Sequence, residues 1–382
     1  MSEQLSQYDE IRPYSPEELP AVLSELLEDP MFTAIVQNFF QGVPVEALKA
    51  KMLSCRNNLE FQKAFIYPLI KQLLAKNCTG LTFESALAPT KRYTYVSNHR
   101  DIVLDSALLS IVLIENGFED TPEIAIGDNL LIYPWIKKLV RVNKSFIVQR
   151  SLSMREMLES SRRMSSYMHY AINEKQQSIW IAQREGRAKD SNDRTQESVL
   201  KMMAMGGEGT PTERLKSLNI APLSISYEYD PCDYLKAQEF QQKRDNPDFK
   251  KSREDDLKNM QTGIFGYKGQ VHYQVAPCIN EWIDEMSTLP KGEFFSAVAQ
   301  RMDADIFRNY RLYPGNYVAA DLLECSTHFA SHYTEEQKQQ FEKYVQSRIA
   351  LVELPNPDTA YLRERILEMY ANPVLNQLSV QQ

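Results

Sequence analysis

The chain has 382 residues, of which 43 are basic and 51 acidic, giving a net charge of −8. Its composition, 43% hydrophobic and 25% charged, is typical of a soluble globular protein and excludes the disordered and fibrous classes. Only 13 residues are glycine, which favours helices over a turn-rich all-β fold. An acidic chain is also a poor match for sequence-independent binding to nucleic acid, which requires a cationic surface.

The five cysteines lie far apart and form no C-x-x-C pair, which is typical of a reduced cytoplasmic protein. The N-terminal residues are acidic and polar, so we expect no secretory signal there. The longest apolar stretch, residues 102–114, is shorter than the roughly 20 residues that cross a bilayer. These features predict a cytoplasmic protein without a transmembrane helix, and they leave peripheral membrane contact open.

Residues 1–80 have helical spacing, with a capping-box pattern at Ser15 to Glu18 and apolar residues from Leu19 to Leu26. Residues 81–280 instead contain short β-rich apolar runs separated by helical stretches. The runs that we expect to be strands are 93–97, 123–127, 145–149, 178–182, 222–227 and 270–276. Residues 281–382 become helical again, with a cap at Thr334. The pattern predicts an α/β fold with a mixed, mostly parallel sheet and crossover helices, flanked by two helical segments.

A histidine follows the first of these strands, at the sheet edge where ligands usually bind. His99 lies between an apolar strand and an amphipathic helix, and imidazole suits a general base near neutral pH. Asp101 or Asp105 could accept its other ring proton and orient it. The alternative is that Asp101 only caps the helix and His99 is an ordinary loop residue.

Four blocks follow one another along the chain: Asn98-His99-Arg100 with a following Asp, residues 145–150 ending in Arg150, Glu185-Gly186-Arg187, and the proline-bearing strand at 221–228. Together they resemble the motifs of the glycerolipid acyltransferases, the superfamily of glycerol-3-phosphate and 1-acylglycerol-3-phosphate acyltransferases. The resemblance covers about residues 92–230. It implies a glycerol-3-phosphate acyltransferase-like fold, and it extends to neither helical flank.

The sequence departs from the family pattern in two places. His99 and Asp105 have five residues between them where the family has four, and Leu104 stands at the position of the family aspartate. The pair therefore requires His99 to lie in the turn before the helix, or Asp101 to take the role; we favour Asp105. Gln183 and Arg184 replace the usual residues before Glu185, which affects the expected shape of the acceptor pocket.

The resemblance implies O-acyl transfer in phospholipid synthesis. His99 would activate the hydroxyl of glycerol 3-phosphate or 1-acylglycerol 3-phosphate for attack on an acyl thioester of coenzyme A or acyl-carrier protein. Substrate-binding candidates are Arg150, Arg187, Arg184, Glu185, Gly186 and Asn98. The arginines would hold the acceptor phosphate. Alternatives are transfer to another lipid hydroxyl, such as that of an acylated amino acid, and a non-catalytic lipid-binding relative.

Charge is unevenly distributed along the chain. Residues 137–189 contain 12 basic and 4 acidic side chains, a local charge of +8, which predicts a cationic face for an anionic membrane surface. Cys325, His328 and His332 have metal-ligand spacing but no further ligand nearby, so we expect no metal site. Neither a P-loop nor a dinucleotide fingerprint is present, and we expect no cofactor.

Overall fold

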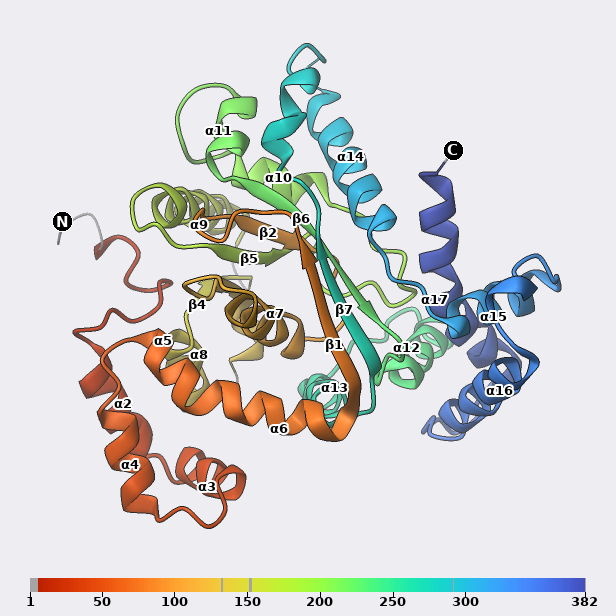
Figure 1. Cartoon of the computed structure of the whole chain (residues 1–382), viewed down its shortest axis with the longest axis horizontal. Coiled ribbons are helices and arrows are strands. Elements are labelled where there is room, and N and C mark those ends of the chain that lie inside the picture. The colour runs from red at the N-terminus through yellow and green to blue at the C-terminus, as the bar shows by residue number, and fades with distance from the viewer. Residues whose placement is uncertain (1–5, 132, 151–152, 291, 382) are drawn as a thin grey trace.

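The computed structural model describes residues 6–131, 133–150, 153–290 and 292–381. These residues form a seven-stranded sheet in the order β1-β7-β6-β2-β5-β3-β4 (Figure 1). The strands are β1 Cys78–Ser85, β2 Thr94–Ser97, β3 Glu123–Gly127, β4 Ser145–Val148, β5 Ile179–Ala182, β6 Ile220–Tyr227 and β7 Gly269–Val275. The strands β2 to β6 run parallel, whereas β7 is antiparallel to β6 and β1 is parallel to β7. The predicted mixed, mostly parallel α/β sheet is confirmed.

The six predicted strands are all present: 123–127 is exact, and the ends of the other five lie within two residues of the prediction. The strand β1 is an addition that the sequence patterns did not predict. It lies at the edge of the sheet, directly after a helix, and its residues alternate between exposed and half-buried. A weakly apolar edge strand of this kind gives little hydrophobic signal.

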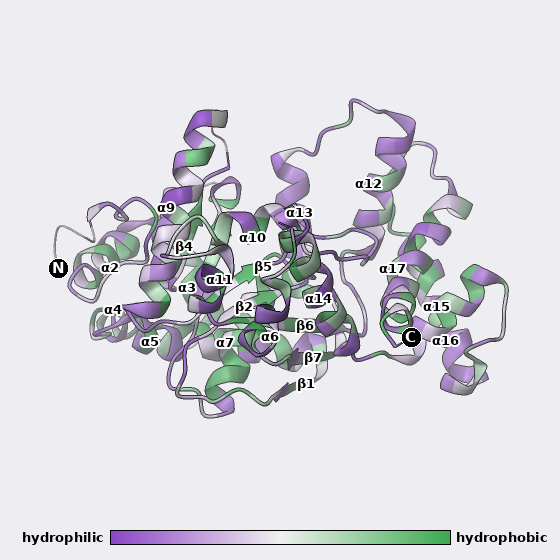
Figure 2. Cartoon of the chain, turned by 90° about the horizontal axis from the view of Figure 1, so that it is seen from above, coloured by the Kyte–Doolittle hydropathy of each residue, from purple (hydrophilic) through white to green (hydrophobic). Residues whose placement is uncertain are grey.

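Helices cover both faces of the sheet because its buried residues alternate in direction. In β5, Ile179 and Ile181 pack with one set of helices, and Trp180 packs with another. The first set comprises α9 Met154–Asn173, α10 Glu197–Met203, α11 Pro211–Ser217 and α14 Phe294–Arg308. The second comprises α6 Tyr67–Asn77 and α7 Leu104–Glu115. Figure 1 shows the sheet between these two sets of helices, and Figure 2 shows apolar residues gathered around the central strands β2 and β5.

The N-terminal helices form their own apolar cluster beside the sheet. They are α2 Leu19–Glu28, α3 Pro30–Phe39, α4 Val45–Leu53 and α5 Asn58–Phe61, followed by the π-helix η1 Gln62–Ile66. They pack against Val142 and Leu139 of α8 Pro134–Val142. The predicted helix start at Ser15 is wrong, because α2 begins at Leu19. The Glu18 carboxylate turns back to accept the backbone N–H of Ser15 and to pair with Arg12, which closes a turn instead.

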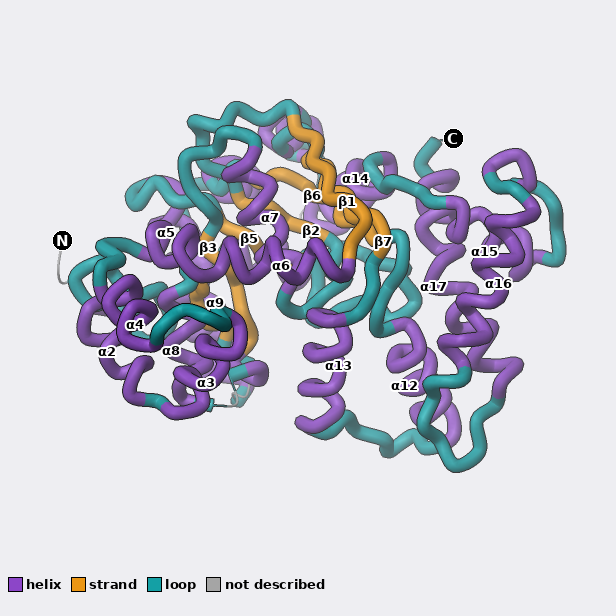
Figure 3. Tube along the Cα trace, turned by 60° about the horizontal axis from the view of Figure 1, so that its bottom comes forward, coloured by secondary structure: helices purple, strands orange, loops and turns teal. Residues whose placement is uncertain are grey.

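The α12–α13 hairpin, α12 Asp233–Asp245 and α13 Arg253–Phe265, is inserted between β6 and β7. Figure 3 shows its connecting loop at the end that lies away from the sheet. The short helices η2 Asp128–Leu130, η3 Ile279–Glu281 and η4 Ile283–Met286 join larger elements. The C-terminal helices are α15 Pro314–Glu324, η5 Ala330–His332, α16 Glu335–Ile349 and α17 Thr359–Ser379. The predicted cap at Thr334 is confirmed.

A buried ionic cluster fastens the C-terminal helices to α12. The carboxylate of Asp233 is fully buried and accepts hydrogen bonds from the hydroxyls of Tyr344 and Tyr370, at 2.6 and 2.9 Å. Its other oxygen pairs with Arg348 Nε at 2.6 Å. Burial raises the pKa of Asp233, and the Arg348 charge opposes that shift. The arginine therefore compensates a carboxylate that water does not reach.

We expect Arg348→Ala to lower the free energy of unfolding by about 3 kcal/mol, because it leaves Asp233 buried without its cation. Urea denaturation at neutral pH measures this loss. Arg363→Ala is the matched control, since Arg363 lies 4.0 Å from Glu342 in an exposed pair, and it should change stability by about 0.5 kcal/mol or less. Equal effects of the two substitutions would contradict the assigned role of Arg348.

Candidate active site

The first candidate residue lies in the loop between β2 and α7. His99 follows Asn98. The Asn98 Nδ2 donates to the carbonyl of Ile225 in β6 at 2.9 Å, and the Asn98 Oδ1 accepts the backbone N–H of the same residue at 2.8 Å. Asn98 is fully buried. We therefore correct the prediction that Asn98 binds substrate, because its amide is committed to joining two strands beneath the loop.

His99 pairs with Asp105. The His99 Nδ1 lies 2.8 Å from Asp105 Oδ2, and the Asp105 side chain is completely buried in the first turn of α7. A carboxylate only accepts, so Nδ1 carries the proton and Nε2 keeps a free lone pair. The extra residue in the motif is accommodated because His99 lies in the loop that precedes the helix.

Asp105 has two further partners that hold it in place. Its Oδ2 accepts the backbone N–H of Arg100 at 2.6 Å, and its Oδ1 accepts the hydroxyl of Tyr227 at 3.0 Å. Tyr227 comes from the end of β6, far along the chain, and its role was not predicted from the sequence. These donors stabilise the charged carboxylate in a site without water, which lets Asp105 orient the histidine ring.

Asp101 has a different role. Its Oδ1 accepts the backbone N–H groups of Val103 and Leu104 at 2.8 and 2.7 Å, where α7 begins. Burial and the neighbouring Asp105 charge raise its pKa. Asp101 is thus the capping residue, and the alternative pairing of His99 with Asp101 does not occur.

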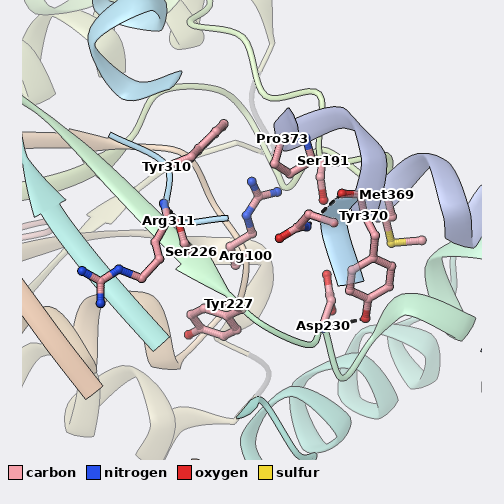
Figure 4. A pocket seen from close by; sticks show the side chains of 11 residues that line it. Arg100, Ser191, Ser226, Tyr227, Asp230, Tyr310, Arg311, Met369, Tyr370 and Pro373 are labelled. Carbon is pink, nitrogen blue, oxygen red and sulfur yellow. Dashed lines mark hydrogen bonds between the residues drawn. The ribbon is translucent and has the colours of Figure 1, made fainter. Parts of the chain in front are cut away.

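Arg100 was also missed in the sequence analysis. It is buried, forms a 2.8 Å ion pair with Asp193 and lies over the ring of Tyr310. It lines a cavity of about 30 Å³ between β6 and the C-terminal helices, together with Tyr310, Asp230 and Tyr370 (Figure 4).

The candidate anion-binding residues divide into two groups. Arg150 is exposed at the end of β4, and its guanidinium lies 3.9 Å from Glu185, in the loop after β5. Arg184 is half-buried in the same loop. Arg187 instead turns toward α13, where it donates to Asn259 Oδ1 at 3.1 Å. Arg150 and Arg187 therefore contact different elements on two sides of the loop.

A tight turn separates these groups. Gly186 has a φ of +69°, in the left-handed region where an L side chain is strained. A Cβ at this position would meet no atom within 4 Å, so backbone conformation and not crowding favours glycine. The turn allows Glu185 and Arg187 to face opposite neighbours.

The prediction that the basic residues between 137 and 189 form one cationic face is wrong, because many of them are paired with carboxylates. Five of the basic side chains there pair with carboxylates from outside the stretch: Lys138 with Glu25, Lys144 with Asp120, Arg163 with Glu10, Lys175 with Glu123, and Lys189 with Glu239. Summing charge along the sequence misses these distant partners. Positive charge is therefore concentrated at smaller sites.

The described part of the chain contains neither a cluster of metal ligands nor a helix that could span a membrane. No group of three or more histidine, cysteine or acidic side chains there could hold a metal ion. His332 stacks on Tyr317 at 4.2 Å between ring centroids. None of the helices in these residues is both long enough and apolar enough to cross a bilayer.

Comparison with known families identifies one region of the chain. Residues 80–225, which contain the His99 loop and β2 to β6 almost completely, match the family model described as Acyltransferase. Among solved structures, the chain is similar to the 1-acyl-sn-glycerophosphate (LPA) acyltransferase PlsC from Thermotoga maritima. The TM-score is 0.37 at 12% identity, with 75% of this chain and 95% of that chain covered. No curated protein matches the chain in sequence.

We expect Gly263→Ala to destabilise the protein by about 1–3 kcal/mol, because overpacking against held groups has this cost. Gly263 of α13 covers the loop, and a Cβ there would lie 2.2 Å from Asp101 Oδ2. At an open helical position, alanine would instead stabilise by up to about 1 kcal/mol. Chemical denaturation distinguishes the two signs. Gly80→Ala is the control, since its Cβ would meet nothing within 4 Å, and a stabilised Gly263→Ala protein would refute the contact.

Proposed function

We propose that the chain is a member of the glycerolipid acyltransferase superfamily and that its site performs the following reaction. The protein transfers a fatty acyl group from an acyl thioester to the hydroxyl of glycerol 3-phosphate or 1-acylglycerol 3-phosphate. The observation that carries the proposal is the His99–Asp105 pair, with Nδ1 and Oδ2 2.8 Å apart at the end of β2. The donor is the thioester of coenzyme A or of acyl-carrier protein.

The proposed reaction is direct transfer between the two substrates. His99 Nε2 takes the proton of the acceptor hydroxyl while the oxygen attacks the thioester carbonyl. The C–S bond then breaks, the thiolate leaves, and the imidazolium returns the proton to it. The new ester forms without an acyl-enzyme intermediate, so the site needs no serine or cysteine nucleophile. Asp105 stabilises the imidazolium and keeps the ring in its reactive tautomer.

We assign the acceptor phosphate to Arg150 and Arg187, the arginines of the second and third sequence blocks. Guanidinium groups match phosphate oxygens in pairs, and Arg187 and Arg150 lie on either side of the loop after β5. Arg184 is the weaker candidate in this loop. Glu185 lies 3.9 Å from Arg150 and would orient it rather than touch phosphate, because like charges repel. Gly186 supplies the turn between them.

Peripheral contact with the cytoplasmic face of an anionic membrane completes the proposal, since an acylated glycerolipid is a membrane component. The N-terminal helices offer the better surface for it. Residues 30–45 carry no charged side chain, and Met31, Ile35 and Val43 are 49%, 39% and 44% exposed. Such an uncharged apolar surface favours the boundary between head groups and acyl chains.

We expect His99→Ala to lower kcat by about 10³, the usual contribution of a general base. Asp105→Asn should also lower kcat strongly, because an amide cannot stabilise the imidazolium. Asp101→Asn is the matched control: asparagine caps helices as well as aspartate does, so activity should stay within a few-fold of wild type. Release of free thiol measures all three. Wild-type transfer by His99→Ala would refute the mechanism.

We expect Arg187→Gln to raise the acceptor KM by about tenfold or more, because a charge-assisted contact to phosphate is lost. The acceptors are glycerol 3-phosphate, 1-acylglycerol 3-phosphate and an acylated amino acid with a free hydroxyl. Exclusive use of the last would refute a phosphate-bearing acceptor. No transfer to any acceptor, together with retained binding to liposomes, would favour the non-catalytic lipid-binding alternative.

A further inference from the structure

A second cluster of cations extends from the candidate site along the α12–α13 hairpin, separate from Arg150. It consists of Lys189 in the loop after β5, Lys243 near the end of α12, and Lys251 in the hairpin loop, next to Arg187. Lys189 and Lys243 both contact the same oxygen, Glu239 Oε1, the latter at 3.0 Å. One carboxylate is thus shared by two lysines, and a net positive charge remains when both amino groups are protonated.

Other contacts do not neutralise this excess. Lys251 pairs with Asp256 at 2.9 Å, whereas one terminal nitrogen of the Arg187 guanidinium is buried without a hydrogen-bond partner in the described part of the chain. Burial, and then repulsion from Lys243, Lys251 and Arg187, lowers the pKa of Lys189. Cations that repel one another over a shared carboxylate are stabilised by an added anion.

We propose that Lys189, Lys243 and Lys251 bind the nucleotide phosphates of an acyl-coenzyme A donor. The inference rests on the proposed function and adds the class of the donor. It identifies a phosphate site that is distinct from the acceptor site at Arg150 and Arg187.

The distance from the loop decides between donor and acceptor. The phosphate of glycerol 3-phosphate lies only a few bonds from the reacting hydroxyl, so it must bind close to His99. In coenzyme A, the pantetheine arm separates the thioester from the nucleotide phosphates. Lys243 lies ten residues after Asp233, about 15 Å along the helix axis away from the end of β6. Because Lys243 lies far along the helix, it suits the nucleotide phosphates of the donor better than the acceptor phosphate.

The shape of the cluster favours a nucleotide over an acidic carrier protein. Residues 233–265 contain seven basic and seven acidic side chains, so the hairpin has no broadly basic surface. Lys189 and Lys251 are partly buried, at 27% and 25% side-chain exposure, whereas Lys243 is 52% exposed at the edge of the cluster. A compact, partly enclosed group of ammonium ions matches a phosphate ester, whereas a folded acidic partner requires a wide exposed face.

The test compares Lys243→Gln with wild type in steady-state transfer from a long-chain acyl-coenzyme A. We expect the donor KM to rise about tenfold, with kcat and the acceptor KM within twofold. A thioester of coenzyme A without its 3′-phosphate should show a smaller difference between the two proteins. Lys201→Gln is the matched control, since Lys201 pairs with Glu197 within α10 and lies outside the cluster. It should leave the donor KM unchanged.

Several results would overturn the inference. An unchanged donor KM or a raised acceptor KM in Lys243→Gln excludes the donor phosphates as the ligand. Activity only with acyl-carrier protein excludes the nucleotide. If the wild type transfers no acyl group, the proposed function fails separately. Calorimetric titration with adenosine 3′,5′-bisphosphate then decides: tighter binding to wild type than to Lys243→Gln supports the phosphate site, and absent or equal binding refutes it.

Discussion

The buried carboxylate of Asp105 is the constraint on which the arrangement of the candidate site depends. A charged group without solvent is stable only with hydrogen-bond donors around it. Here the donors are the ring of His99, the backbone N–H of Arg100 and the hydroxyl of Tyr227. Tyr273 of β7 also donates to the backbone carbonyl of Asp105, at 2.8 Å. The position of the histidine is thus fixed from β2, β6 and β7 together, which explains why the antiparallel strand is part of the site.

The C-terminal helices contact the loop after β5 and hold it in place. The loop that follows Arg187 is held by C-terminal helices: Thr195 donates to Asp303 of α14 at 2.6 Å, and Arg194 donates to Asn376 of α17 at 2.9 Å. In the same loop, Asp193 pairs with Arg100, which follows β2. The loop between β2 and α7 is therefore joined directly to the loop after β5. The substrate contacts proposed at the two strand ends would be coupled through this link, and the C-terminal helices hold the second loop in place.

The sequence predicted the local parts of this arrangement and missed the distant ones. Short apolar runs marked six strands because most of their residues are buried, while β1, half-exposed at the edge, gave no such signal. The His99–Asp105 pair was predicted from the family resemblance, with Asp101 as the alternative, and its irregular spacing is accommodated because His99 lies in the loop before the helix. Tyr227 and Asp193 could not be assigned, since each meets its partner only after the sheet and the loop after β5 are formed. A one-dimensional charge count failed for the same reason, because carboxylates such as Glu239 arrive from other elements.

Net charge and local charge act over different distances in this molecule. At physiological ionic strength, charges are screened beyond about 8 Å, so the overall −8 has little influence on an anion already at the loop. The electrostatic potential at such an anion depends on the nearest charges. Arg150 lies beside one carboxylate, and Lys189 and Lys243 contact a single shared carboxylate oxygen. When both of those lysines are protonated, Glu239 compensates only one of them, and the partial burial of the site screens the remaining charge less than surface charge. An acidic protein can therefore bind anionic substrates, provided that its cations outnumber the carboxylates at the site itself.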